Sequence, residues 1–133
     1  MYLNTLTNVE KELFLELALN ACYANGELDP NEKVMMDQYG SEMGIKINSY
    51  KPLKTQSQVL EDLKSIKAIE TLRKIYIEIT ALMMVDGVID KDEEKYLKEI
   101  QKIASLKDSQ VVRIRTSLEQ IFSGYEYLNS IIS

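Results

Sequence analysis

Residues 85–94 read VDGVIDKDEE, and this stretch decides the fold because it contains the signals that end one helix and begin another. Gly87 suits the left-handed backbone conformation found just past a helix end. Asp90 and Glu93 have the spacing of a capping box, in which each side chain accepts a hydrogen bond from the other residue's backbone N–H. The stretch therefore predicts a helical hairpin, with an acidic turn between its two helices.

An earlier stretch, ANGELDPNEK at residues 24–33, repeats this pattern. A shift of 61 residues aligns the turn and cap residues of the two stretches: Gly26 with Gly87, Asp29 with Asp90, and Glu32 with Glu93. One helical hairpin cannot bury its own apolar face. We therefore expect two related hairpins, over residues 8–44 and 67–106, to pack together and to superimpose.

Capping signals and apolar residues at helical spacing extend the prediction along the chain. Six helices are predicted: from Thr7 to before Gly26, from Asp29 to Gly44, over about 56–64, over about 67–85, from Asp90 to about Ala104, and from Asp108 to Gly124. The tail YEYLNSIIS can add a short seventh, and no stretch alternates as a strand would. The predicted fold is all-α, a compact bundle of about six to seven helices in one domain over residues 1–133.

The helix over about 67–85 is expected to be the longest and to lie inside the bundle. Its second half, IYIEITALMMV, is apolar nearly all the way round, which is typical of a helix enclosed by others. We expect Ile75, Ile79 and Leu82 at the centre of the core.

Two compositional features exclude several kinds of site. The chain has no histidine and one cysteine, Cys22, which is expected to be a buried thiol. Zinc fingers, thiolate clusters and nucleophile pairs that need an imidazole are therefore excluded. Any bound metal should be a hard cation held by oxygen ligands, namely Ca²⁺, Mg²⁺ or Mn²⁺.

The two turns, within YANGELDPNE and MVDGVIDKDEE, resemble the tellurite-resistance TerB-like family, which includes the N-terminal domain of DjlA-type DnaJ-like proteins. The resemblance covers roughly residues 10–107. It implies a compact helical bundle with a metal-binding acidic patch, and it implies no settled biochemical activity. Asn25 stands where an aspartate is usual in the family, which weakens a metal site at the first turn. Residues 86–93 also resemble the second half of an EF-hand loop, but Leu82 and Met84 stand where that loop needs oxygen ligands.

The candidate metal ligands are the acidic residues of the two turns: Asp86, Asp90, Glu93, Asp29 and Glu32. Two interpretations of these residues stay open. They cap helices, where Asp and Glu also interact favourably with the helix dipole, or they form a functional hard-cation site. Catalysis by paired carboxylates is a distant third interpretation, because residues at helix starts on a small bundle rarely form a deep cleft.

The sequence predicts a TerB-like binding or stress-response module and no enzyme. The alternative is a protein-binding scaffold without metal. The net charge of −5 argues against nucleic acid as a partner, and no apolar run is long enough to span a bilayer. We therefore expect a cytoplasmic protein whose partner is another protein. Tyr125 and Tyr127 would anchor that partner if exposed, although burial is the commoner state of tyrosine.

Overall fold

The structure, a computed structural model, describes residues 1–23, 28–85 and 87–133. Within these ranges a short 3-10 helix, η1 (Leu3–Thr5), precedes six α-helices, and no strand is present. The helices are α1 (Asn8–Cys22), α2 (Pro30–Met43), α3 (Gln56–Leu63), α4 (Ile69–Met84), α5 (Lys91–Ile103) and α6 (Asp108–Ile132). The prediction of an all-α bundle is confirmed.

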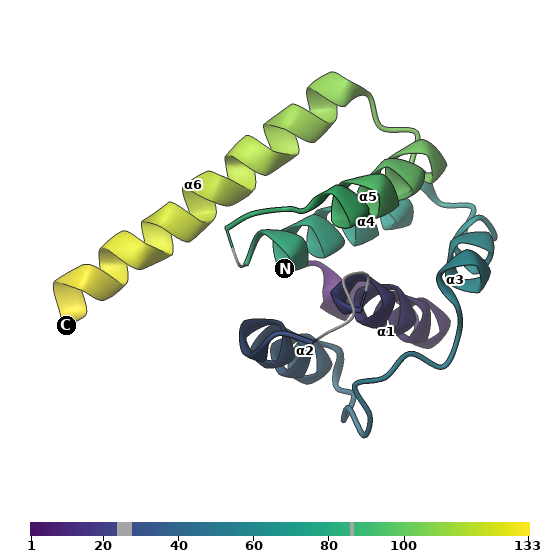
Figure 1. Cartoon of the computed structure of the whole chain (residues 1–133), viewed down its shortest axis with the longest axis horizontal. Helices are drawn as coiled ribbons and strands as arrows, with labels where there is room; N and C mark the ends of the chain where they lie inside the picture. The colour runs from purple at the N-terminus through teal and green to yellow at the C-terminus, as the bar shows by residue number, and fades with distance from the viewer. Residues whose placement is uncertain (24–27, 86) are drawn as a thin grey trace.

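The bundle is built from two helical hairpins, α1 with α2 and α4 with α5. Shifting the bounds of α1 and α2 by 61 residues reproduces the bounds of α4 and α5 to within one residue. The central helices α1 and α4 pack against each other, and α3 lies at one end, in contact with both α1 and α5 (Figure 1). The hairpins of the sequence repeat are therefore joined through their first helices.

Helix α4 supplies the centre of the core, as predicted. Ile75, Ile79 and Leu82 are completely buried. Two buried tyrosines tie the hairpins together, because each donates a hydrogen bond to a backbone carbonyl of the other hairpin. The Tyr39 hydroxyl donates to Glu78 O at 3.1 Å, and the Tyr96 hydroxyl donates to Leu17 O at 3.2 Å. The thiol of Cys22 is buried, as expected.

One buried residue of α4 is charged, which the apolar pattern did not predict. Glu78 is 2% exposed, and its Oε1 accepts a hydrogen bond of 2.8 Å from the backbone N–H of Tyr2. The same oxygen lies 2.8 Å from the amino group of Met1. A buried carboxylate needs such partners, so Glu78 attaches the first residues of the chain to the bundle.

The last helix differs from the prediction in two ways. First, α6 has 25 residues against 16 in α4, so α4 is not the longest helix. Second, α6 passes through Gly124 without a break and includes the tail that was expected to form a separate turn. A glycine inside a helix costs only about 1 kcal/mol relative to alanine, which the hydrogen bonds of a continuous helix can offset.

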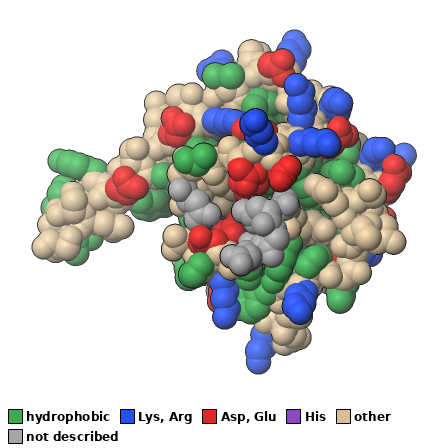
Figure 2. Space-filling view, in the orientation of Figure 1, with side chains coloured by type: hydrophobic (Ala, Val, Ile, Leu, Met, Phe, Trp, Pro, Cys, Tyr) green, Lys and Arg blue, Asp and Glu red, His purple; other side chains and the backbone are tan. Residues whose placement is uncertain are grey.

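The second half of α6 extends beyond the bundle (Figure 1). Ile121 is 38% exposed, and Tyr125 and Tyr127 are 63% and 67% exposed. Figure 2 shows this segment as an arm with hydrophobic side chains along it. Along the described residues, no helix combines the length and the apolar character needed to cross a membrane.

Candidate functional site: two acidic turns

The acidic residues of the first turn are engaged in capping α2. Asp29 Oδ1 accepts a hydrogen bond of 2.7 Å from Asn31 N–H, and Glu32 Oε1 accepts one of 3.0 Å from Asp29 N–H. Pro30 occupies the first turn of α2, where its missing N–H is not needed. The predicted capping box is therefore present at this turn.

The second turn repeats this geometry at the start of α5. Asp90 Oδ1 accepts a hydrogen bond of 2.8 Å from Glu93 N–H, and Glu93 Oε1 accepts one of 3.1 Å from Asp90 N–H. Gly87 has φ +88°, in the left-handed region that favours glycine. Its N–H donates to Met84 O at 2.9 Å, which satisfies a carbonyl at the end of α4.

The fold brings the two capping glutamates near each other. Glu32 is 4% exposed and Glu93 is 7% exposed, although both are carboxylates at helix starts. Burial, together with the negative charges of Asp90 and Glu32, raises the pKa of Glu93 from its ordinary value of 4.5 to about 7. Near neutral pH, Glu93 therefore exists partly as the protonated acid, even though Asp90 N–H donates to it.

The carboxyl group of Glu93 can gain or lose a proton near neutral pH, as an acid–base catalyst must. A substrate, however, must reach within hydrogen-bond distance of the catalytic group. The side chain of Glu93 is almost completely covered, so a substrate has little access to its carboxyl group. The arrangement favours a role for Glu93 in stability or ion binding over acid–base chemistry on a substrate.

The structure brings together some of the predicted metal ligands and does not test the others. Glu32 and Glu93 approach each other, and Asp29 and Asp90 each use one oxygen in capping. Asp86 lies outside the described residues. Among the residues that are described, no three side chains of His, Cys, Asp or Glu gather closely enough to hold a metal ion. A hard cation would therefore need further ligands.

Sequence reasoning missed Arg115, which connects this region to α6. Its guanidinium donates two hydrogen bonds to the carboxylate of Glu94, from Nη1 at 2.6 Å and from Nη2 at 3.1 Å. The hydrogen bond to Glu94 raises the pKa of Arg115 further above its already high value. The available signal was an arginine among apolar residues at helical spacing in α6, but spacing alone did not identify its acidic partner.

No family model, curated protein or solved structure matches this chain.

Proposed function

We propose that this chain is a TerB-like binding module that acts by docking another protein and has no catalytic activity. The observation that supports docking is the uncovered second half of α6, where Tyr125, Tyr127 and Leu128 are 63%, 67% and 55% exposed. Contiguous exposed apolar patches commonly mark interaction sites, and tyrosine is frequent among the residues that dominate binding energy. The resemblance to TerB-like proteins adds a role in a stress response of the tellurite-resistance type.

A photo-crosslinking amino acid tests the docking proposal directly. It is placed at residue 125 or at residue 127 in cells that make the protein, and adducts are identified by mass spectrometry. Both side chains are exposed on α6, but they point to different sides of the helix. We expect a protein adduct from one position in preference to the other.

The protein found in the adduct must then bind the purified chain, and this binding must be lost when Tyr125 is replaced by glutamate. Equal labelling from both positions, or no such binding, would contradict docking.

A second candidate function is the binding of a hard divalent cation at the acidic turns. The observation that favours it is the proximity of buried Glu32 and Glu93, since carboxylates so placed repel each other when both are ionised. A cation would offset this repulsion in place of the proton on Glu93. Asp86 and the second carboxylate oxygen of Asp90 would be the further ligands, with Ca²⁺, Mg²⁺ or Mn²⁺ as the ion.

Serine at position 90 separates capping from cation binding. Serine caps a helix about as well as aspartate but removes a carboxylate ligand. Wild type should gain about 2.7 kcal/mol of stability at an ion concentration one hundred times the dissociation constant. Asp90→Ser should lose that gain and still melt near the wild-type temperature without ion. Asp29→Ser is the matched control. It should reduce the stability gained from the ion by less, because Asn25 in the first turn already lacks the charge of its counterpart Asp86. Failure of millimolar divalent ion to stabilise wild type would leave capping as the sole role.

A further inference from the structure

Helix α6 carries one apolar seam along its whole length. Seven apolar residues follow one another at alternating spacings of three and four: Val111, Ile114, Leu118, Ile121, Tyr125, Leu128 and Ile132. This alternation is the heptad pattern of the core positions in helices that pair side by side. The seam therefore runs from the first turn of α6 to its last.

The bundle covers the first three residues of the seam and leaves the other four uncovered. Val111 and Ile114 pack against the core, and Leu118 is 2% exposed. The remaining residues, which we name the free seam, are all exposed, least at Ile121 and most at Ile132: Ile121 38%, Tyr125 63%, Leu128 55% and Ile132 83%. The face of α6 that packs on its own bundle thus continues as an apolar face without a cover.

The free seam and its neighbours offer enough area for a small, stable interface. Ile131 is 65% exposed beside the seam, and Phe122 is partly exposed. Burial of an apolar side chain of this size removes roughly 60–120 Å² from water, since it contributes about 1.5–3 kcal/mol at about 25 cal/mol per Å². Six such side chains on each of two chains correspond to roughly 700–1,400 Å² in total, which reaches the lower end of specific protein interfaces at about 1,200 Å².

The charges of this segment favour a second copy of the chain as the occupant. Residues 116–133 contain two acidic residues, Glu119 and Glu126, and no lysine or arginine. Both glutamates occupy the same heptad position, one residue after a seam residue, and the positions that flank the free seam carry no charge. Residues of like charge beside the seam would repel each other in a pair of identical helices. No charged residue occupies the positions that flank the free seam. An anionic lipid surface would instead be recognised by lysine and arginine.

We propose that the free seam pairs with the free seam of a second copy, as two antiparallel helices related by a two-fold axis; this rests on the proposed docking function. Antiparallel helices pair residues so that Tyr125 meets Leu128 of the other copy and Ile121 meets Ile132. This register covers all four residues of the free seam. A two-fold interface uses the same patch on both chains, which suits a patch that is complementary to itself.

The position of the bundle decides the antiparallel direction. Each bundle covers the seam along the first half of its own α6. The partner helix must pack on this same face of α6, over the second half. Parallel pairing would bring both bundles to the same end, between the two helices, where they would collide. Antiparallel pairing puts the bundles at opposite ends.

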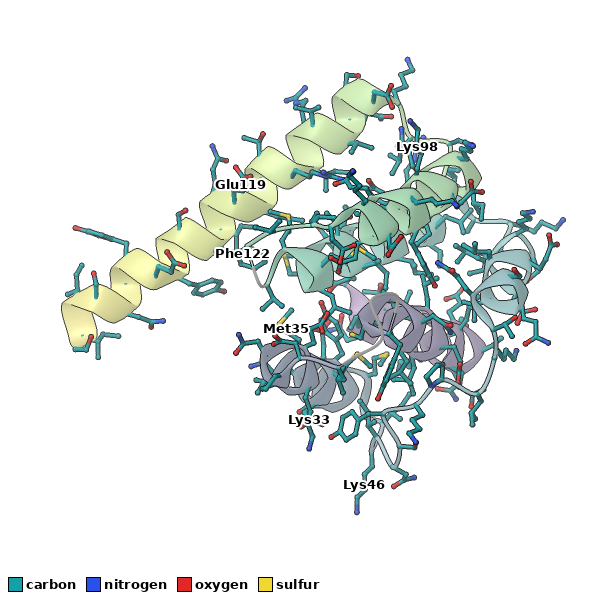
Figure 3. The ribbon with its side chains drawn as sticks, in the orientation of Figure 1. Lys33, Met35, Lys46, Lys98, Glu119 and Phe122 are labelled. Atoms are coloured by element: carbon teal, nitrogen blue, oxygen red, sulfur yellow. The ribbon has the colours of Figure 1, made fainter. Side chains whose placement is uncertain are left out.

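The antiparallel register also gives the end of the partner helix a place to pack. A groove of about 440 Å³ lies where α6 leaves the bundle, with Met84, Val85 and Phe122 as its apolar lining and Glu119 and Glu126 among its polar lining. Figure 3 shows Phe122 on α6 at this position, near the end of α4. Ile132 of a second copy, placed against Ile121, would lie next to this groove.

Sedimentation equilibrium of the purified chain tests the pairing, with two matched tyrosine variants. Tyr125 belongs to the free seam, whereas Tyr127 is about 200° further round the helix and is equally exposed. We expect wild type and Tyr127→Glu at roughly 100 µM to sediment at twice the 15.3 kDa of one chain, as a micromolar dissociation constant requires. Tyr125→Glu should sediment at 15.3 kDa with an unchanged far-ultraviolet circular dichroism spectrum. A monomeric wild type, or a dimer that persists in Tyr125→Glu, would overturn the proposal.

Disulfide formation between single-cysteine variants tests the direction. The native Cys22 is buried and should not react. A disulfide needs Cβ atoms about 3.5–4.5 Å apart, so Tyr125→Cys and Leu128→Cys should give a covalent dimer when mixed and little when alone. Efficient linkage of Tyr125→Cys to itself would indicate parallel helices and contradict the register.

The photo-crosslinks distinguish a failure of this inference from a failure of docking. An adduct from residue 125 with twice the mass of the chain supports both. A monomeric chain that crosslinks to a different protein overturns the pairing and keeps the docking function. A monomeric chain without an adduct contradicts both.

Discussion

At the scale of single residues, Glu93 makes stability depend on pH in an unusual direction. Its pKa is raised to about 7 in the folded protein from an ordinary 4.5, so the folded state binds more protons than the unfolded state between these values. Stability from this residue is therefore fully present below about pH 4.5 and is lost as the pH rises to about 7. Most carboxylates that are paired in the folded state have the opposite effect.

Replacing Glu93 with glutamine tests this direction, because glutamine also completes a capping box. Glu93→Gln should leave the free energy of unfolding nearly unchanged at pH 4.5. At pH 8 it should raise that free energy by roughly 1–3 kcal/mol, since one pKa unit corresponds to about 1.4 kcal/mol. Urea unfolding at the two pH values measures the difference. Glu10→Gln, at the same capping position in the more exposed first turn of α1, is the control and should show no such pH-dependent gain.

Leu82 tests the predicted core at the same scale. The side chain is completely buried in α4, so Leu82→Ala should lower the free energy of unfolding by about 2–5 kcal/mol through lost burial and a residual cavity. Leu53→Ala is the matched control, because Leu53 is 89% exposed, and its effect should stay within about 0.5 kcal/mol. Equal effects of the two substitutions on denaturant unfolding would contradict the packing of α4.

At the scale of elements, local signals predicted the helix starts better than the helix ends. Thr7, Asp29 and Asp90 cap helices as their side chains indicated, and the left-handed Gly44 and Gly87 follow helix ends. Gly124 carried the same signal and was interpreted wrongly as an end. Whether a glycine ends a helix depends on the residues beyond it, and those after Gly124 continue the apolar spacing of α6.

Two glycine substitutions compare these cases. Gly124 lies inside α6 with open space around an added Cβ, so Gly124→Ala should raise the free energy of unfolding by about 0.5–1 kcal/mol. Gly87 also has open space, but its φ of +88° strains any residue with a side chain. Gly87→Ala should therefore lower the free energy of unfolding by roughly 1–2 kcal/mol. The two opposite signs are measured by thermal or urea unfolding. A stabilising Gly87→Ala would contradict the described turn.

At the scale of the whole molecule, the repeat predicted the two hairpins, and their helix bounds agree with the 61-residue shift. The superposition of the hairpins stays a prediction. The sequence could not predict that Glu32 and Glu93 lie near each other, because no local pattern encodes the distance between two turns. It also could not predict the exposed arm, because apolar spacing shows that a helix has an apolar face but not what covers that face.

The central claim is that a partner copy covers the free seam, and backbone hydrogen exchange tests it most directly. A lone segment of about a dozen residues is marginal as a helix in water, so amides over residues 121–132 should exchange fast unless the seam is paired. We predict slow exchange there in concentrated wild type. Dilution or Tyr125→Glu should make exchange fast in this segment, while the buried amides of α4 stay protected. Exchange over 121–132 that is equally fast, or equally slow, at every concentration and in the variant would contradict the claim.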